Sequence, residues 1–268
     1  MTDQRVLITG SAGVVGTLMR PRLRRPGRVL RLLDVAAQTA SDAAEEIVTA
    51  SVTDAAAMAS ACEGVDALIH LGGHSRENSW AATLEVNIDG THTVLEAARE
   101  AGVKRVILAS SNHAVGFRRT DSDLPADSSP RPDTYYGVSK AVIESLGSLY
   151  HSRFGMDVIV IRIGSCFETP LKLGPRGLTT WLSPDDGARL FEACLSAPSP
   201  GYRLIWGVSD NTRRIYSLAE AEALGYKSLD NAEVYADRLA DQPAPAGAAA
   251  EFVGGPFCTA PLGEFNPL

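Results

Sequence analysis

Short apolar runs alternate along the chain with longer segments in which apolar residues recur at helical spacing. The short runs have the length of buried strands, whereas the longer segments, clearest at 83–101 and 134–154, predict amphipathic helices. The predicted strands cover residues 5–9, 29–33, 46–48, 66–71, 105–110, 157–163 and 203–207. Strands and helices that alternate in this order form right-handed crossover units. The pattern therefore predicts an α/β fold, a doubly wound parallel sheet with helices on both faces.

Three segments interrupt this alternation. Residues 118–133 are polar and rich in proline, which predicts a long surface loop beside the sheet edge. Residues 241–250, "DQPAPAGAAA", predict a flexible connector before a short apolar tail. Pro21 falls inside the predicted helix after the first strand. Because proline lacks the N–H and clashes with the preceding turn, we expect that helix to bend or to end early.

Composition limits the kinds of partner. The chain has 268 residues, of which 45% are hydrophobic, and this is enough for one large core. A net charge of −7 argues against a nucleic-acid partner or an anionic membrane surface, and an anionic substrate would need a local cation. The four cysteines and five histidines show no metal-binding spacing, and no apolar run approaches the roughly 20 residues that span a bilayer. We therefore expect a cytoplasmic protein with reduced thiols and no metal.

A glycine-rich turn follows the first predicted strand. The segment "ITGSAGVVG" places Gly10, Gly13 and Gly16 at the mouth of a helix. Glycine permits the tight turn and lets backbone N–H groups approach a pyrophosphate at the helix N-terminus. Asp34 ends the second predicted strand, where a carboxylate accepts hydrogen bonds from the ribose hydroxyls of NAD and repels the 2′-phosphate of NADP. These features predict a Rossmann-type fold that binds NAD.

A cluster of arginines offers an alternative, a site for the 2′-phosphate of NADP. It consists of Arg20, Arg22, Arg24, Arg25, Arg28 and Arg31. Most of these residues fall near the end of the first helix and in the turn after it, at the edge of the sheet opposite the cofactor. We therefore favour a solvated basic face, and the cofactor prediction remains NAD.

A tyrosine and a lysine share one face of the helix predicted at 134–154. Tyr136 and Lys140 are four residues apart, whereas Tyr135 is offset by about 100°. A free phenol is a poor base at neutral pH, but a neighbouring ammonium group together with an oxidised nicotinamide would lower its pKa. Ser110 and Ser111 end the fifth strand at the ligand-binding edge, where a serine can hydrogen-bond the substrate oxygen. The tyrosine–lysine spacing alone is a weak signal, but its order after the glycine turn and the serine strengthens it.

These motifs resemble the extended branch of the short-chain dehydrogenase/reductase superfamily. In that branch the active serine stands five residues before a glycine, here Gly116, which selects Ser111 over Ser110. Within the superfamily, the chain resembles the uronate dehydrogenase family nearly from end to end. The matching segments are "HLGGHS", "ASSNHAVGF", "RPDTYYGVSK", "IRIGSC", "TTWLSPDDG" and "LGYKSLDNAE".

The resemblance implies roles for individual positions. Tyr136 corresponds to the proton acceptor, Lys140 to its partner on the nicotinamide ribose, and Ser111 to the serine that binds the reacting hydroxyl. The positions that match residues holding the sugar acid are Ser75, Asn112, His113 and Arg176. The positions expected around the cofactor are Gly10, Ala12, Gly13, Val14, Val15, Gly16, Asp34, Ser51, Val52, Leu71, Gly72, Gly73, Lys140 and Ser165. Ser51 stands where the family has an aspartate near the adenine amino group.

The expected reaction is oxidation of a uronic acid, such as galacturonate or glucuronate, at its anomeric C1 to the aldarolactone, with hydride transfer to NAD. The expected organisation is a single domain, 1–268, with an NAD-binding core at 1–164 and mostly substrate-binding and C-terminal elements at 165–268, in a homo-oligomer. Arg176 supplies the local cation, although a solvent-exposed loop arginine is the alternative. His113 is expected to donate a hydrogen bond to a substrate hydroxyl, with a satisfied histidine in the pocket wall as the alternative.

Two other functions remain open from the sequence. A nucleotide-sugar epimerase or reductase would share every motif up to Lys140, but the short remainder leaves little room to grip a nucleoside diphosphate. A non-catalytic protein that senses NAD would typically lack the tyrosine–lysine pair.

Overall fold

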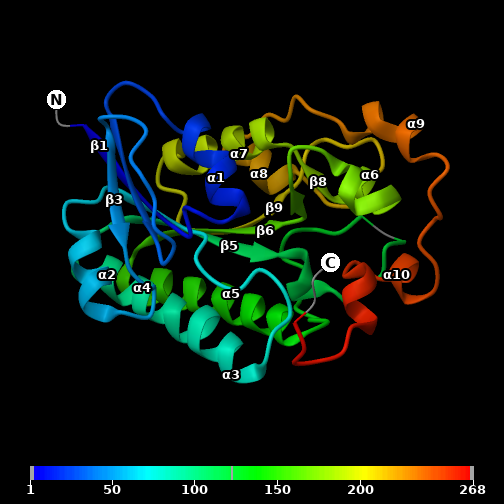
Figure 1. The fold of residues 1–268 in the computed structure, drawn as a ribbon, viewed down its shortest axis with the longest axis horizontal. Coiled ribbons are helices and arrows are strands. Elements are labelled where there is room, and N and C mark those ends of the chain that lie inside the picture. Colours follow the sequence, from blue (N-terminus) through cyan, green and yellow to red (C-terminus); the bar gives the residue numbers. More distant parts are fainter. Residues whose placement is uncertain (1–2, 122, 266–268) are drawn as a thin grey trace.

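The computed structural model describes residues 3–121 and 123–265, which form one seven-stranded parallel sheet flanked by helices (Figure 1). The sheet contains β1 (Gln4–Thr9), β2 (Arg28–Asp34), β3 (Glu45–Thr49), β4 (Ala67–His70), β5 (Arg105–Ser111), β6 (Asp157–Ile163) and β9 (Tyr202–Gly207). Their order is β3-β2-β1-β4-β5-β6-β9. All seven predicted strands are present, and the predicted fold class is confirmed. The order reverses between β1 and β4, the point at which such sheets bind ligands beyond the strand ends.

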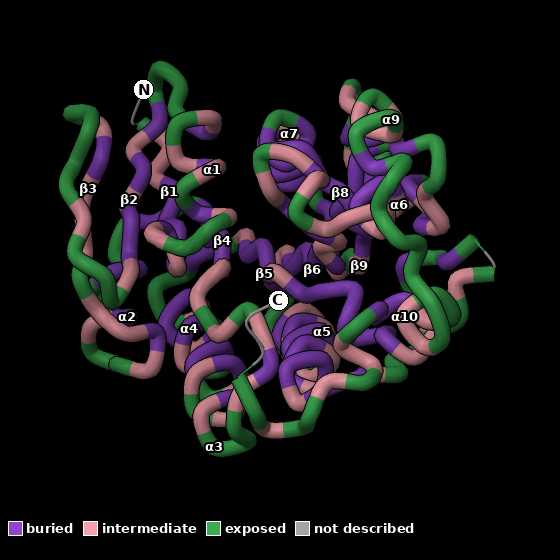
Figure 2. The backbone as a smooth tube through the Cα atoms, turned by 45° about the vertical axis from the view of Figure 1, so that its right-hand side comes forward, coloured by how far each residue is buried: buried purple, intermediate pink, exposed green. Residues whose placement is uncertain are grey.

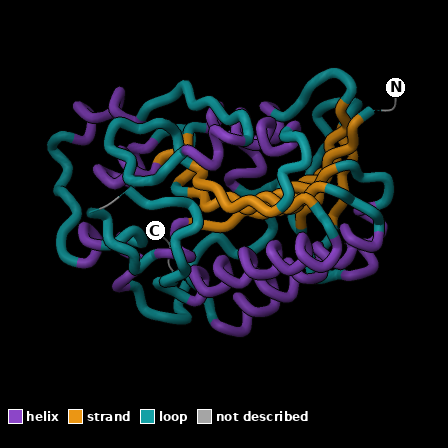
Figure 3. The backbone as a smooth tube through the Cα atoms, turned by 180° about the vertical axis from the view of Figure 1, so that it is seen from behind, coloured by secondary structure: helices purple, strands orange, loops and turns teal. Residues whose placement is uncertain are grey.

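Two helical layers cover the sheet (Figure 3). One layer contains α1 (Val14–Arg22), α7 (Pro184–Ser196) and α8 (Ala219–Ala223), and the other contains α2 (Ala55–Cys62), α4 (Gly90–Glu100) and α5 (Tyr135–Phe154). Successive strand residues supply the two layers in turn, since Val6 and Ile8 pack with the first and Leu7 with the second. Burial is concentrated along the strands and on the helix surfaces that face them (Figure 2).

Shorter elements follow the principal ones. They are α3 (Trp80–Thr83), α6 (Gly177–Thr180), α9 (Ala236–Leu239), α10 (Ala248–Glu251) and a two-stranded sheet of β7 (Ser165–Cys166) and β8 (Trp181–Leu182). The helix predicted at 83–101 is α3 and α4 joined by a π-helical turn, Leu84–Asp89. The helix predicted at 134–154 is α5, whose first turn is capped by the Thr134 hydroxyl, which accepts from the Gly137 N–H at 3.0 Å. As expected, α1 ends early, one residue after Pro21. No helix within the described ranges combines the length and apolarity needed to cross a membrane.

Segment 118–133 is not simply a surface loop; its residue Ser122 lies outside the described residues. Leu124 and Ala126 are buried. Their carbonyls accept from buried side chains, Leu124 from Trp206 Nε1 at 3.0 Å and Ala126 from Arg162 Nη1 at 2.9 Å. The surface-loop prediction was therefore wrong for this part of the segment, because donors on β6 and β9 draw its backbone into the protein.

The predicted connector 241–250 ends in ordered structure. Residues 241–247 are exposed, but the last three positions belong to α10. The Thr120 N–H donates to the carbonyl of Glu251 at 3.0 Å, and its hydroxyl donates to that of Ala250 at 2.9 Å. These bonds fix the start of the C-terminal tail, which we define as residues 252–265.

The arginine cluster is not a solvated basic face. Each of its six members pairs with a carboxylate on a neighbouring element. The pairs are Arg20 and Arg24 with Glu45, Arg22 with Asp185, Arg25 and Arg28 with Glu192, and Arg31 with Glu46. The prediction of a solvated basic face was therefore wrong. The preference for NAD over NADP gains support, because guanidinium groups already paired with carboxylates are poor ligands for a 2′-phosphate.

His70, at the end of β4, should make the stability of the fold sensitive to acid. Its ring lies between the hydroxyls of Thr9, 2.7 Å from Nδ1, and Thr91, 3.0 Å from Nε2. Burial, reinforced by the nearby ammonium of Lys140, lowers the pKa of His70 from 6.5 to about 3. The unfolded chain therefore binds this proton first as the pH falls, so stability is complete above pH 6.5 and is lost as the pH falls toward 3.

For this residue alone we expect the free energy of unfolding to drop by about 1 kcal/mol between about pH 6.5 and about pH 5.5. Urea titrations of the wild type and a His70→Gln variant at the two pH values measure the difference. The free energy of unfolding of the variant should change less between the two pH values than that of the wild type. An equal change in the two proteins would contradict the assignment.

Candidate functional site

The glycine turn after β1 leaves no space for side chains. Gly10 has φ +69°, and a Cβ on it would lie 2.6 Å from the backbone N of Gly72. A Cβ on Gly16 would lie 2.4 Å from the Gly10 carbonyl oxygen. Gly13 is the N-cap of α1 and provides no side-chain cap, so the first N–H groups of that helix, beginning at Val14, face the turn without a side-chain acceptor. A turn of this kind suits an anionic ligand such as a pyrophosphate.

Asp34 lies against the same turn. Its Oδ2 accepts from the Ala12 N–H at 2.9 Å, and its Oδ1 accepts from the Ala36 N–H at 3.0 Å. The carboxylate is thus fixed at the end of β2, where a ribose would lie beside it. The predicted residue and the predicted turn meet at one place in the structure.

The far side of the turn is formed by the segment after β4. The Leu71 N–H donates to the Thr9 carbonyl at 3.1 Å. A Cβ on Gly72 would lie 2.9 Å from Val52 Cγ1, and one on Gly73 would lie 2.9 Å from Asn87 Oδ1. These predicted cofactor positions therefore surround the glycine turn, and the groups present fit a dinucleotide.

Two other predicted cofactor positions, Ser51 and Ser165, use their hydroxyls in bonds to nearby residues of the chain. The Ser51 hydroxyl lies 2.8 Å from the Thr53 hydroxyl and accepts from the Thr53 N–H at 3.2 Å, so it closes its own turn. Ser165 lies on β7, and its hydroxyl accepts from Thr180 Oγ1 at 3.2 Å.

The tyrosine and lysine of α5 meet the serine of β5. The Ser111 hydroxyl lies near enough to the Tyr136 phenol to lower the pKa of that phenol, and it donates to Asn112 Oδ1 at 3.2 Å. Lys140 Nζ lies 5.4 Å from the centroid of the Tyr136 ring and donates to the Ala109 carbonyl at 2.8 Å. Ser110 instead donates to Glu144 Oε1 at 2.7 Å. The structure thus brings together the three residues expected to react and leaves Ser110 out.

The neighbouring Tyr135 lies elsewhere. Its ring packs edge-on against Trp80, with centroids 5.4 Å apart. This contact is consistent with the offset of about 100° that separates Tyr135 from Tyr136 on the helix.

Burial acts on both ionisable groups of the pair. It raises the pKa of Tyr136 to about 12, although the nearby Ser111 hydroxyl opposes this shift. It also lowers the pKa of Lys140 to about 8. Lys140 does not by itself bring the pKa of the phenol toward neutrality, so the expected lowering depends on the second positive charge, that of an oxidised nicotinamide.

Three of the residues expected to hold the sugar acid contact the C-terminal tail. Asn112 Nδ2 donates to the Val253 carbonyl at 3.2 Å, and Arg176 Nη2 donates to the same oxygen at 2.8 Å. The ring of His113 stacks on Phe257, with centroids 4.0 Å apart and an interplanar angle of 29°. The tail therefore forms one wall of the site, together with Asn112, His113 and Arg176, which the sequence analysis had identified. Ser75 is exposed in the loop after β4.

Sequence reasoning missed Glu77, which links the C-terminal tail to the start of α5. Glu77 is fully buried. Its Oε2 accepts from the Tyr136 N–H and its Oε1 from the Gly263 N–H, both at 2.9 Å. No local pattern marks this glutamate, because both partners are distant in the sequence.

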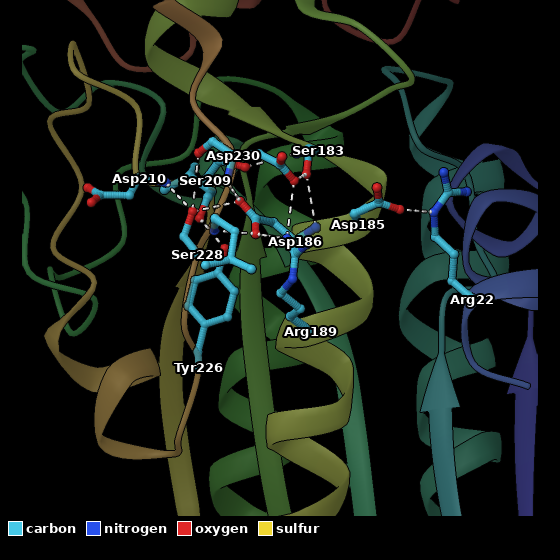
Figure 4. A network of polar contacts seen from close by, with 12 residues as sticks. Arg22, Ser183, Asp185, Asp186, Arg189, Ser209, Asp210, Tyr226, Ser228 and Asp230 are labelled. Carbon is cyan, nitrogen blue, oxygen red and sulfur yellow. Dashed lines mark hydrogen bonds and ion pairs between the residues drawn. The ribbon is translucent and has the colours of Figure 1, made fainter. Parts of the chain in front are cut away.

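A polar network holds the remaining C-terminal segments in place (Figure 4). The carboxylate of Asp186, in the first turn of α7, accepts from the Ser228 hydroxyl at 2.6 Å and from the N–H groups of Leu229 and Asp230 at 2.8 and 3.1 Å. It also pairs with Arg189 at 2.5 Å. These donors satisfy the carboxylate, so the segments "TTWLSPDDG" and "LGYKSLDNAE" support the structure around the site.

Comparison with known proteins gives the family. The model of the NAD dependent epimerase/dehydratase family matches residues 6–168. The chain belongs to this family. Within the family, a uronate dehydrogenase from Pseudomonas putida is 43% identical to the chain, over 98% of the chain and 97% of the relative. The predicted resemblance to uronate dehydrogenases is confirmed.

Two further members of the family bear on cofactor and substrate. A tyrosine-to-alanine mutant of uronate dehydrogenase from Agrobacterium tumefaciens, solved in complex with NAD, superposes with a TM-score of 0.92 at 37% identity, covering 97% of this chain and 98% of that one. An NAD-dependent glucose-6-phosphate dehydrogenase from Haloferax volcanii is 39% identical over 85% of this chain and 94% of its own length.

Proposed function

We propose that the chain is an NAD-dependent dehydrogenase that oxidises a uronic acid at its anomeric C1 to the aldarolactone. The observation that carries the proposal is the buried phenol of Tyr136, which lies beside Ser111 and is flanked by Lys140 at the ligand-binding edge of the sheet. The similarity to uronate dehydrogenases extends over nearly the whole chain and supports the choice of substrate class.

Each residue of the reacting group has a separate task. Ser111 hydrogen-bonds the C1 hydroxyl oxygen and directs its proton toward the phenol. Tyr136 accepts that proton as the C1–H bond breaks, so that the C1–O bond becomes the carbonyl of the lactone. Lys140 is placed to bind the nicotinamide ribose. NAD, when bound, accepts the hydride from C1 and adds the positive charge that favours the phenolate.

Arg176 is the proposed partner of the substrate carboxylate. In the part of the chain that the structure describes, it forms no ion pair with a carboxylate. Its bond to Val253 uses only one of the five N–H donors of a guanidinium. A guanidinium can bind a carboxylate through two parallel hydrogen bonds, which gives an acidic protein a local site for an anion.

An Arg176→Gln variant should therefore bind uronates poorly. Loss of a charge-assisted pair costs about 1.5–3 kcal/mol, so we expect KM for galacturonate to rise about tenfold to a hundredfold. Activity on the uncharged aldose galactose, however low, should change far less. Steady-state kinetics with both sugars measure the two effects.

Arg213→Gln is the matched control, because Arg213 is an exposed arginine already paired with Glu233. It should behave as the wild type on both sugars. Equal losses on galacturonate and galactose in Arg176→Gln would remove the proposed role of Arg176.

Three further features belong to the proposal. Residues 1–164 form the NAD-binding core and residues 165–268 are mostly substrate-binding and C-terminal elements, within a single domain. The protein acts in the cytoplasm without a nucleic-acid or membrane partner. It assembles as a homo-oligomer, which light scattering of the purified protein tests directly.

The proposal is tested by incubating the purified protein with NAD and single substrates while reduced nicotinamide is followed by absorbance. Galacturonate and glucuronate should be turned over, whereas UDP-sugars should not. Glucose 6-phosphate is included because a relative at 39% identity is named for it. A preference for the sugar phosphate would replace the uronate proposal with that second candidate. NAD binding without turnover of any sugar would favour a cofactor sensor.

A further inference from the structure

A buried carboxylate lies directly behind His113. The side chain of Asp133 is 0% exposed, and its Oδ2 lies 2.6 Å from His113 Nδ1. Its Oδ1 accepts from the Thr134 hydroxyl at 2.8 Å. Asp133 thus joins the histidine after β5 to the cap of the helix that carries Tyr136.

The surrounding backbone is shaped to admit this carboxylate. A Cβ on Gly116 would lie 2.0 Å from Asp133 Oδ2, and one on Gly254 would lie 1.9 Å from the same atom. A Cβ on Gly137 would lie 2.9 Å from Oδ1. Three glycines from separate segments therefore leave a space that the aspartate side chain fills. A larger side chain would not fit in it.

The contact with Asp133 determines which nitrogen of the His113 ring carries a proton. An ionised carboxylate only accepts hydrogen bonds, so Nδ1 of His113 must carry the proton that lies between it and Asp133. Nε2 of the neutral ring is then left with a lone pair. The ring is also held in place by stacking on Phe257 and by an edge contact with Tyr136, with centroids 5.7 Å apart.

We propose that Asp133 is a positioning residue for substrate binding, which fixes His113 as the Nδ1–H tautomer so that Nε2 accepts a hydrogen bond from a sugar hydroxyl. The inference rests on the proposed function, since it takes His113 to contact the sugar acid. It changes the expected role of His113, from donor to acceptor. It also gives a physical reason for Gly116, which the motif comparison used only as a marker of position.

The tautomer can be measured without any substrate. Nitrogen-15 NMR of the histidine side chains, with His113 assigned by comparison with a His113→Ala variant, should show a protonated Nδ1 and a bare Nε2 at neutral pH. A protonated Nε2 in the wild type would overturn the proposal. Glu77→Gln is the matched control, because Glu77 is an equally buried carboxylate near the start of α5 that accepts from the backbone of Tyr136 and Gly263. It should leave the His113 signals unchanged.

Kinetics test the consequence for binding. In an Asp133→Ala variant we expect KM for galacturonate to rise about tenfold or more, as loss of a charge-assisted hydrogen bond implies. KM for NAD should stay within about twofold, because Lys140 and the glycine turn are not touched. The conservative Asp133→Asn variant retains an acceptor oxygen and should recover most of the loss.

A double-mutant cycle shows whether Asp133 acts through His113. In a His113→Ala background, removal of Asp133 should cause no further rise in KM for the sugar. Fully additive penalties, or a parallel rise in KM for NAD, would mean that Asp133 only supports the fold and would refute the proposal. Absence of uronate turnover in the wild type would instead refute the proposed function, and the NMR result would still decide the tautomer.

Discussion

Replacing Tyr136 with phenylalanine should lower kcat for uronate oxidation by about 100-fold to 10,000-fold, the usual contribution of a positioned general base. The phenyl ring keeps the packing of the buried tyrosine, so the fold and NAD binding should persist. What disappears is the oxygen beside Ser111 that would accept the C1 proton. Single-turnover and steady-state measurements with galacturonate give kcat, and a fluorescence titration gives the affinity for NAD.

The adjacent tyrosine provides the control. Tyr135 packs against Trp80 rather than facing Ser111, so Tyr135→Phe should retain kcat within about threefold. If the two variants lost activity equally, the oxygen of Tyr136 would not be the proton acceptor, whatever the helix geometry.

Replacing Glu144 with glutamine should destabilise the protein by about 3–5 kcal/mol, the cost of leaving a buried charge without its partner. Arg162 is fully buried and donates to both carboxylate oxygens of Glu144, at 2.8 and 2.7 Å. It also donates to the carbonyls of Ala126 and Ser128. The same pair therefore anchors the segment that leads to Asp133 and the start of α5.

Urea unfolding measures the loss as a lower midpoint with an unchanged slope. The exposed pair of Arg213 and Glu233 serves as the comparison, since Glu233→Gln should change the free energy of unfolding by less than about 1 kcal/mol. A Glu144→Met, Arg162→Met double variant should recover much of the stability, because it removes both charges together. A Glu144→Gln protein as stable as the wild type would show that Arg162 finds other acceptors.

The sequence was most informative for candidate site residues that lie at the end of a strand or directly after it. Gly10, Asp34 and Ser111 each follow or end a strand with clear apolar patterning, and parallel strands bring their carboxyl ends to one edge of the sheet. Tyr136 and Lys140 were identifiable because helical spacing alone puts them on one face. The positions could therefore be predicted from local periodicity combined with one rule of topology.

Local pattern failed where the partner is remote in sequence. The arginines looked solvated because Glu45 and Glu192, which neutralise them, lie on other elements. Residues 118–133 looked exposed because no composition signal shows that Arg162 will take their carbonyls. Glu77 and Phe257 carried no signal for the same reason: each acts only through a contact made after the chain has folded.

The anchoring of the C-terminal tail has a practical consequence for handling the protein. The carbonyl of Val253 and the N–H of Gly263, both in the C-terminal tail, are bonded to residues around the proposed reacting centre. An affinity tag or an immobilisation linker fused to this tail would lie close to the proposed sugar-acid site. β1 begins at the amino-terminal edge of the parallel strands, opposite the edge that carries the candidate site (Figure 1), which makes the N-terminal side the safer point of attachment for a biosensor or a supported catalyst.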